Sequence, residues 1–392
     1  MPEGTRRADV VVVGGGVIGL TLAWRARAKG LSVTVLERGE IGMGTSHVAA
    51  GMLAPVAEVE FGDAGQAVLE LGLHSAEMWP EFAAELERCS GEQVGLLRTG
   101  TLVLARDEDE ARELERQIAF RESLGLRTTR LRPSEARERE PALAPTTRLG
   151  MEAPEDHSVD PRLVLVALRR VCERVGVELR VHASVARIEL DRAGTRVTGV
   201  SLQDGELVCA HHVVIAAGAW SGSLEGLPSE ACVPVRPVKG QILRLRDPAG
   251  PGLLRRVVRF EGGYLVPRAD GRYVLGATVE ERGFEEQATA GGVYELLREA
   301  HELLPGVSEL QIEELCVGLR PGTPDNVPVI GAGVLAGLIW ATGHHRNGIL
   351  LAPLTAELVL QALLGKQTTG DLPLTACDPS RFQVLSPVGV TH

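Results

Sequence analysis

The sequence lacks the features that mark several large classes of protein. Its six cysteines are far apart and form no CxxC or Cys/His cluster, so neither a disulfide framework nor a structural zinc site is expected. No segment reaches the roughly 20 uninterrupted apolar residues that a membrane span needs. Acidic residues outnumber basic ones, and the net charge of −11 argues against a nucleic-acid backbone or an anionic membrane as partner.

The remaining composition is that of a globular protein in a reducing compartment. The 392 residues exceed what one ordinary core organises, so two domains, or one domain with a large insertion, are expected. Arg6 and Arg7 before the apolar stretch 10–23 imitate a secretion signal, but Asp9 and three glycines interrupt the pattern and no cleavage site follows. We therefore predict a cytoplasmic protein.

The start of the chain carries a dinucleotide-binding fingerprint in its full context. Residues 10–13 are all valine and predict a buried parallel strand. The sequence GGGVIG at 14–19 follows, then a helical pattern that ends near Gly30 and a second strand that ends on Glu37. GxGxxG alone is a weak signal, but with its strand, helix and terminal acid it predicts a dinucleotide site.

Each part of this fingerprint has a physical role. Gly14 and Gly16 allow the backbone to approach a pyrophosphate, and Gly19 lets the helix pack close to the strand. The N-terminus of the helix supplies unpaired N–H groups and positive potential. Glu37 can accept the hydroxyls of an adenosine ribose. The fingerprint by itself does not decide between FAD and NAD.

The loop behind the second strand favours FAD. An NAD enzyme would usually continue into another strand–helix unit, whereas residues 38–55 are rich in small and hydroxylated side chains. Thr45 and Ser46 can donate to phosphate, and the small residues let the backbone approach a flat ring. A distant strand over 211–218 ends in Ala-Ala-Gly and is expected to return beneath the cofactor, with Val185 placed to meet the adenine.

Seven stretches in order along the chain resemble one family, the glycine oxidase branch of the FAD-dependent D-amino-acid oxidase superfamily. They are VVVVGGGVIGL, GTSHVAAGMLAP, HHVVIAAGAWSG, VRPVKGQIL, GGYLVPRADGRYVLGAT, GLRPGTPDNVPVIG and ATGHHRNGILLAP, and together they reach from residue 10 to residue 353. The last two are the most specific.

The resemblance implies an α/β fold (α+β in its two-domain arrangement): a Rossmann-type FAD-binding domain and a substrate domain built on a large antiparallel sheet. The expected segments are 1–62, 146–230 and 321–370 for the FAD-binding domain, 63–145 and 231–320 for the substrate-binding domain, and 371–392 for a loosely attached C-terminal tail. The sequence pattern agrees, because alternating strands fill 231–320 around one helical pattern at 292–305.

An enzyme that oxidises an amino acid must hold its carboxylate, because only that fixes the α-carbon against the flavin. The planar fork of arginine suits this task, and Arg320 and Arg346 lie in the two most specific stretches. The resemblance implies that Arg320 clamps the carboxylate, that Arg346 lies beside the substrate, and that Tyr264 shares the carboxylate or closes the pocket.

Two departures from the family pattern concern the size of the pocket. Val279 stands where relatives often carry methionine, and Gly262 and Gly263 precede Tyr264 where bulkier residues occur. Both changes remove volume near the expected substrate. We therefore predict a pocket that accepts N-substituted glycines as readily as glycine.

The stretch 341–353 resembles the C-terminal flavin motif of this family. In that motif a glycine turn brings backbone N–H groups and the start of a helix to the pyrimidine edge of the flavin, where they stabilise the reduced anion. The resemblance implies that His344 and His345 form cofactor wall, mainly through the backbone, and that Arg346 faces the substrate. The helix is expected to begin directly behind these residues.

The predicted site residues fall in short, separate segments. The predicted cofactor-binding residues are Gly14, Gly16, Val17, Ile18, Gly19, Glu37, Arg38, Thr45, Ser46, Ala50, Gly51, Met52, Val185, Ala217, Gly218, Trp220, His344, His345, Asn347, Gly348, Ile349 and Leu350. The predicted substrate-binding and catalytic residues are Arg320, Arg346, Tyr264 and Val279. No metal site is expected.

These observations predict an FAD-dependent oxidase of glycine or an N-substituted glycine. The imine product would hydrolyse to glyoxylate plus ammonia or a primary amine, with O₂ reduced to H₂O₂. A D-amino-acid oxidase, or an amine dehydrogenase with another electron acceptor, would use the same fold. The arginines disfavour a non-catalytic flavin-binding protein, and the loop after Glu37 disfavours an NAD(P) dehydrogenase. Relatives also suggest a homo-oligomer.

Overall fold

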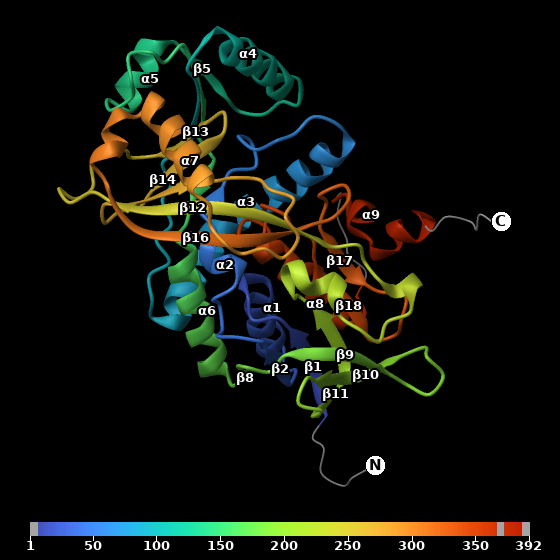
Figure 1. The fold of residues 1–392 in the computed structure, drawn as a ribbon. Helices are drawn as coiled ribbons and strands as arrows, with labels where there is room; N and C mark the ends of the chain where they lie inside the picture. The colour runs from blue at the N-terminus through green and yellow to red at the C-terminus, as the bar shows by residue number, and fades with distance from the viewer. Residues whose placement is uncertain (1–6, 367–371, 386–392) are drawn as a thin grey trace.

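Two sheets of eight strands organise the chain, one above the other in Figure 1. The computed structural model describes residues 7–366 and 372–385. The first sheet, here called the nucleotide sheet, contains β1 (Ala8–Val13), β2 (Val33–Leu36), β8 (Glu178–Arg180), β9 (Val185–Leu190), β10 (Val197–Leu202), β11 (Leu207–Ile215), β17 (Val329–Ala332) and β18 (Leu338–Thr342). The two-stranded pair of β3 (Met52–Leu53) and β7 (His157–Ser158) stands apart from both.

The nucleotide sheet is parallel through its centre. Its order is β17-β18-β11-β1-β2-β8, and β9 and β10 attach through β11. Val10, Val11, Val12 and Val13 of β1 are buried on both faces, which is why an unbroken run of β-branched residues forms this strand. The helix α1 (Val17–Ala28) follows, and Gly30, with φ of 88°, turns the chain into β2. The predicted strand–turn–helix–strand unit is confirmed.

Four helices pack on one side of the nucleotide sheet. They are α1, α3 (Asp63–Ser90), α6 (Pro161–Val175) and α8 (Ala352–Leu363). In α3 the buried side chains recur every three or four residues, at Leu71, Ser75, Trp79, Phe82 and Leu86, which is the spacing of one helix face.

The second sheet forms the floor of the substrate domain and is antiparallel except for one pair. Its order is β16-β12-β15-β14-β13-β4-β6-β5, and only β13 and β4 run parallel. The bounds are β4 (Thr101–Ala105), β5 (Thr129–Leu131), β6 (Leu149–Ala153), β12 (Arg236–Arg246), β13 (Val257–Phe260), β14 (Gly263–Pro267), β15 (Arg272–Gly276) and β16 (Gln311–Gly322). The predicted large antiparallel sheet is confirmed.

Helices cover the outer face of this sheet. The predicted helix at 292–305 is α7 (Ala290–Leu303), which begins behind Thr289, whose side chain accepts from the Gly292 amide. Leu296, Ala300 and Leu303 lie on its buried face against the sheet. The helix α5 (Pro133–Arg139) packs on the same face, whereas α4 (Glu108–Ser123) packs against the opposite face of β4 and β6.

The predicted domain boundaries need two shifts. Helix α3, assigned to the substrate domain, packs in the core of the nucleotide sheet, because its apolar face meets α6 and α8. Strand β6, assigned to the FAD-binding domain, pairs with β4 and β5 in the second sheet. Residues 63–90 therefore go with the nucleotide sheet, and residues 149–153 go with the second sheet.

The described part of the C-terminal tail is attached, not loose. Cys377 at the end of α9 (Leu374–Cys377) is fully buried, and Arg381 pairs with Asp325 at 3.1 Å. These contacts hold the segment beside β17. The rest of the predicted tail, residue 371 and residues 386–392, lies outside the described residues.

No helix within 7–366 and 372–385 is both long enough and apolar enough to cross a membrane.

Two buried tryptophans allow the energetic contribution of one hydrogen bond to the C-terminal turn to be measured. Trp79 of α3 donates from Nε1 to the Leu350 carbonyl at 2.8 Å, whereas Nε1 of Trp340 meets no partner among the described residues. Trp79→Phe should therefore lower the free energy of unfolding by about 1 kcal/mol more than the matched Trp340→Phe. Urea unfolding of both variants measures the difference, and equal losses would contradict it.

Candidate active site

A continuous cavity of about 630 Å³ is lined by residues of both sheets. Most of the predicted site residues line it: Gly14, Gly16, Val17, Ile18, Glu37, Arg38, Thr45, Ser46, Ala50, Gly51, Met52, Val185, Ala217, Gly218, Trp220, Tyr264, Val279, Arg320, His344, His345, Arg346, Gly348 and Ile349. Three predicted residues do not, namely Gly19, Asn347 and Leu350. A cavity of this size is near the middle of the range for small-molecule and cofactor sites.

The turn at 14–19 has the shape that a pyrophosphate requires. Gly14 has φ of 111°, and a Cβ there would collide with the Ala216 carbonyl at the end of β11. Gly19 does not line the cavity, because its role is to let α1 approach the Gly14 carbonyl. The first turn of α1 carries no acidic residue that would oppose an anion. These residues therefore fit the phosphates of a dinucleotide.

Glu37 is held in a fixed position in the cavity lining. Its carboxylate accepts from the Gly15 amide at 2.8 Å and from the Gly39 amide at 3.1 Å. The next residue, Arg38, places its guanidinium 3.4 Å from the ring centroid of Trp220, and Phe284 stacks on the same ring at 5.6 Å. Arg38 and Trp220 were predicted separately, and the structure joins them in one stack.

The short helix α2 (Thr45–Val48) connects the cofactor loop to the second sheet. Thr45 donates its hydroxyl to the Leu319 carbonyl of β16 at 2.8 Å, so this donor is directed to the sheet and not to a phosphate. Ser46 accepts from the Val17 amide at 3.1 Å and caps the first turn of α1.

Two arginines fix the end of this loop by donating hydrogen bonds to its backbone carbonyls. Arg244 donates to the His47 carbonyl at 2.7 Å, and Arg268 donates to the Ala50 carbonyl at 2.6 Å. Gly51, with φ of 80°, passes so close to the Val159 carbonyl that no Cβ fits. The wall formed by Ala50, Gly51 and Met52 is thus rigidly placed.

The C-terminal motif forms a tight turn in front of α8. His345 adopts a left-handed φ of 46°, and its amide donates to the Pro321 carbonyl at 2.8 Å. The regular helix begins at Ala352, later than expected, because residues 348–351 are still in turns. Asn347 and Leu350 line a separate cavity of about 30 Å³ behind this turn.

The two histidines of this motif are neutral. Burial lowers the pKa of His344 to about 3, and its Nε2 meets the Thr355 hydroxyl at 2.9 Å. Burial and the positive charge of Arg320 lower the pKa of His345 to about 4. Neither side chain supplies a cation, which agrees with their predicted place in the cofactor wall.

Arg320 is held rigidly above the second sheet. Its Nη1 donates to the Lys239 carbonyl at 3.3 Å and to the Thr278 carbonyl at 3.2 Å. The guanidinium lies over Gly240, where a Cβ would come within 2.6 Å of its central carbon. Within the described part of the chain only Nη1 makes such bonds, so other N–H groups remain for a carboxylate.

Tyr264 is close to Arg320. Burial raises the pKa of its hydroxyl, against the opposing effect of the Arg320 charge, so the group is a neutral donor. The ring lies opposite Gly276 of β15, where a Cβ would come within 2.7 Å of the hydroxyl oxygen. Glycine at this position therefore makes room for the tyrosine.

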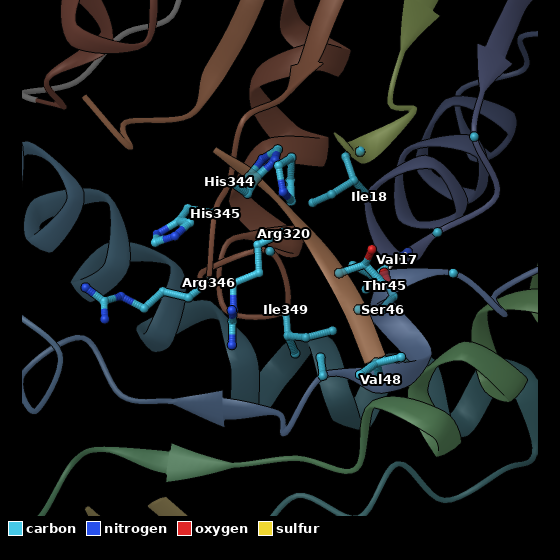
Figure 2. Close-up of a pocket in the computed structure, with 18 of the residues that line it drawn as sticks. Val17, Ile18, Thr45, Ser46, Val48, Arg320, His344, His345, Arg346 and Ile349 are labelled. Carbon is cyan, nitrogen blue, oxygen red and sulfur yellow. Dashed lines mark hydrogen bonds between the residues drawn. The ribbon is translucent and has the colours of Figure 1, made fainter. Parts of the chain in front are cut away.

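Arg346 differs from its predicted placement. It lines the cavity, but its guanidinium forms an ion pair with Glu60, in the loop before α3. Figure 2 shows its side chain extending away from Arg320. The structure therefore does not bring the two predicted arginines together.

A buried polar network beneath Arg320 was not predicted. Lys239 is fully buried, and its Nζ lies 3.0 Å from Glu285 and 3.5 Å from Glu280. Glu280 also accepts from the Thr278 hydroxyl at 2.6 Å and from Gln241 at 2.8 Å. The carbonyls of Lys239 and Thr278 are the two that hold Arg320, so this network positions the clamp.

Two further charged residues of the cavity were missed, Arg259 and Glu58. Arg259 pairs with Tyr264 across the β13–β14 hairpin, and the Gly262 and Gly263 turn signal could have placed it there. Glu58 lies beyond the predicted cofactor loop, and no sequence signal marks it. Within residues 7–366 and 372–385 no cluster of acidic, histidine or cysteine side chains could hold a metal ion.

A cavity that fits a dinucleotide and has in its lining Arg320, with N–H groups unbonded to any described residue, fits the class of flavin-dependent oxidoreductases. Residues 9–362 match the FAD dependent oxidoreductase family, and the chain belongs to it. The predicted family and the predicted cofactor, FAD, are confirmed.

The relatives specify the class further. A glycine oxidase of Geobacillus kaustophilus is 36% identical over 94% of this chain and 96% of its own length. A crystal structure of glycine oxidase from that species has a TM-score of 0.88 at 34% identity and covers 96% of this chain and 99% of the other. The chain is thus a glycine oxidase-like, FAD-dependent enzyme, as predicted.

Some relatives are longer. The bifunctional protein ThiO/ThiG of Trichormus variabilis is 37% identical over 96% of this chain, but the match covers 55% of its own length. The chain spans about half the length of this relative.

The histidines predict a loss of stability in acid. The unfolded chain protonates each imidazole near pH 6.5, whereas the folded chain does so only near pH 3 for His344 and pH 4 for His345. The two buried histidines therefore cost the folded state nothing above pH 6.5, where they are neutral in both states. The free energy of unfolding falls as the pH drops from 6.5 toward 4, because the unfolded chain binds protons that the folded chain does not. For His344 the loss from pH 7 to 5 is on the order of 2 kcal/mol. Melting temperatures should fall over this range, and less steeply in His344→Gln; identical slopes would contradict the assignment.

The network beneath Arg320 predicts an indirect effect on carboxylate binding. Lys239→Met leaves Glu280 and Glu285 without their buried partner, so the carbonyls that hold Arg320 should shift. The Kd for acetate, read from the flavin spectrum, should rise by roughly 10-fold. Arg298→Met, an exposed variant on α7, serves as the control. An unchanged acetate Kd in a folded, FAD-loaded Lys239→Met protein would refute the positioning role.

Proposed function

We propose that the enzyme oxidises glycine or an N-substituted glycine at the α-carbon. The observation that carries this proposal is Arg320, fixed by two backbone carbonyls above Gly240 with N–H groups to spare. FAD, when bound, supplies the two-electron acceptor. The imine then hydrolyses to glyoxylate plus ammonia or a primary amine.

The residues of the chain act mainly by binding and orientation. Arg320 takes the carboxylate through a charge-assisted fork, and the neutral Tyr264 donates to the same group. Ile349 and the buried His344 exclude water from the wall opposite the second sheet. The substrate amine loses its proton to solvent, so orientation supplies most of the rate enhancement asked of the protein.

Val279 supports the proposed room for N-substituents. Its side chain lines the cavity and is 72% exposed, so a short residue here leaves the entrance open. Gly263 contributes differently from our expectation, because a Cβ there would come within 2.7 Å of the Gly276 carbonyl. Glycine at 263 therefore serves close strand pairing, and the argument for a wide pocket rests on Val279.

Three further properties belong to the proposal. We place O₂ as the electron acceptor, with H₂O₂ as product, because the relatives above are named oxidases. A cytoplasmic location is consistent with six unpaired cysteines. A homo-oligomer follows only from resemblance to the family.

An oxygen-electrode screen with peroxide detection tests the proposed function. Glycine, sarcosine and N-ethylglycine should be oxidised faster than D-alanine and D-proline, because Arg320 and Val279 favour a small α-carbon and an open amine side. Arg320→Met should lower kcat/KM for glycine by about 100-fold or more, the cost of a lost charge-assisted fork.

The outcomes separate the alternatives. Faster turnover of D-alanine would favour a D-amino-acid oxidase. Reduction of the flavin by glycine without peroxide release would favour a dehydrogenase. Arg298→Met controls for a general effect of removing positive charge, and equal losses in both variants would refute the clamp.

A further inference from the structure

The substrate end of the cavity carries more charge than one amino-acid carboxylate needs. Arg320 and Tyr264 suffice for that carboxylate, yet Arg259 and Glu58 line the same cavity. Arg259 lies opposite Tyr264 in the β13–β14 hairpin, so both side chains project from one face of the sheet.

The guanidinium of Arg259 is only partly satisfied. Its Nη1 donates to the Ala57 carbonyl at 2.6 Å, and its Nη2 lies 3.6 Å from a Glu58 oxygen, beyond hydrogen-bond length. Its Nε is buried and meets no partner among the residues that the structure describes. The side chain is 21% exposed. Because Nη2 makes no hydrogen bond to a described residue and Nη1 makes one, the terminal nitrogens of Arg259 have donors free for an anion that enters the cavity.

Glu58 is held in place from behind. The buried Asp156 accepts from the Val56 amide at 3.2 Å and from the Ala57 amide at 2.6 Å. Arg121 donates to both carbonyls of this segment. The backbone directly before Glu58 is therefore fixed by hydrogen bonds. The Glu58 carboxylate, 9% exposed, has a defined position beside Arg259.

The sheet order fixes the sequence of three of these side chains along the cavity. Arg320 comes from the β16 side, Tyr264 from β14 and Arg259 from the next strand, β13. With Glu58 beside Arg259, the wall presents two positive groups and one negative group. A ligand that matches this wall carries two negative groups and one positive group.

We propose that the enzyme prefers N-(carboxyalkyl)glycines, secondary amines with a second carboxylate on the N-substituent. This rests on the proposed oxidation of N-substituted glycines. Arg320 and Tyr264 bind the glycine carboxylate, Glu58 binds the amine while it is protonated, and Arg259 binds the second carboxylate. Glycine and sarcosine have no second carboxylate, so they make no contact with Arg259.

The reaction on the simplest member, N-carboxymethylglycine, balances. A methylene C–H bond breaks, its hydride carries two electrons to the cofactor, and the amine loses a proton to solvent. Water adds to the C=N bond and splits it into glyoxylate and glycine. O₂ takes up the two electrons with two protons and leaves as H₂O₂. The released glycine keeps the carboxylate that Arg320 binds.

Binding of two unreactive ether analogues to the FAD-loaded enzyme tests the subsite without turnover. Methoxyacetate matches sarcosine, and diglycolate matches N-carboxymethylglycine, with oxygen in place of nitrogen. Titrations of the flavin spectrum should give a Kd for diglycolate about 10-fold or more below that for methoxyacetate, since a second charge-assisted contact forms. Equal Kd values in the wild-type enzyme would overturn the proposal.

Variants locate the effect. Arg259→Met should bring the ratio of the two Kd values close to one, and Arg259→Lys should restore part of it. Arg255→Met removes an exposed charge four residues away, outside the cavity, and should keep the wild-type ratio. A wild-type ratio in folded Arg259→Met, or the loss of the ratio in Arg255→Met, would also overturn the subsite.

Turnover separates this inference from the proposed function. The kcat/KM of N-carboxymethylglycine should exceed that of N-ethylglycine, a neutral analogue of similar size, by about 10-fold or more. Oxidation of glycine and sarcosine without this preference would refute the dicarboxylate subsite and leave the proposed function intact. If no amine in the series is oxidised, the proposed function itself fails, whatever the ether analogues show.

Discussion

Three consecutive residues at the end of β16 hold the two halves of the site together. The Leu319 carbonyl receives the hydroxyl of Thr45 from the cofactor loop, and the Pro321 carbonyl receives the amide of His345 from the C-terminal turn. Between them, Arg320 lies above the sheet, bonded to the Lys239 and Thr278 carbonyls. A single strand end thus holds both the cofactor loop and the C-terminal turn, one through a side-chain hydroxyl and the other through a backbone amide.

The charge of Arg320 is not cancelled by its immediate partners, and the two histidines of the C-terminal turn carry no charge. Burial keeps His344 and His345 uncharged, and Arg320 is supported by backbone carbonyls instead of a carboxylate. An arginine held by neutral acceptors keeps its full attraction for an incoming anion. In the part of the chain that the structure describes, the carboxylates of Glu280 and Glu285 do not contact Arg320 through hydrogen bonds. They pair with the buried Lys239 and balance its charge.

The sequence is a good guide where the structure is determined locally. The turn from Gly14 to Gly19 needs particular residues at fixed spacing, and most predicted cofactor residues line one cavity. The misplaced features depend on distant partners. The apolar face of α3 does not say which sheet it will meet, and the pairing of Arg346 with Glu60 joins two unrelated loops. Arg259 was missed although a local turn signal at Gly262 and Gly263 is present, and the strand register shows that it lies opposite Tyr264.

The stack of Arg38, Trp220 and Phe284 has a mechanical consequence. Phe284 belongs to the segment 277–289, which also carries Val279 at the entrance and is tied through Glu280 to the residues beneath Arg320. One loop therefore contacts the Arg38 and Trp220 stack in one part of the cavity and the residues beneath Arg320 in another. Any movement of this loop would change contacts in both parts of the cavity at once.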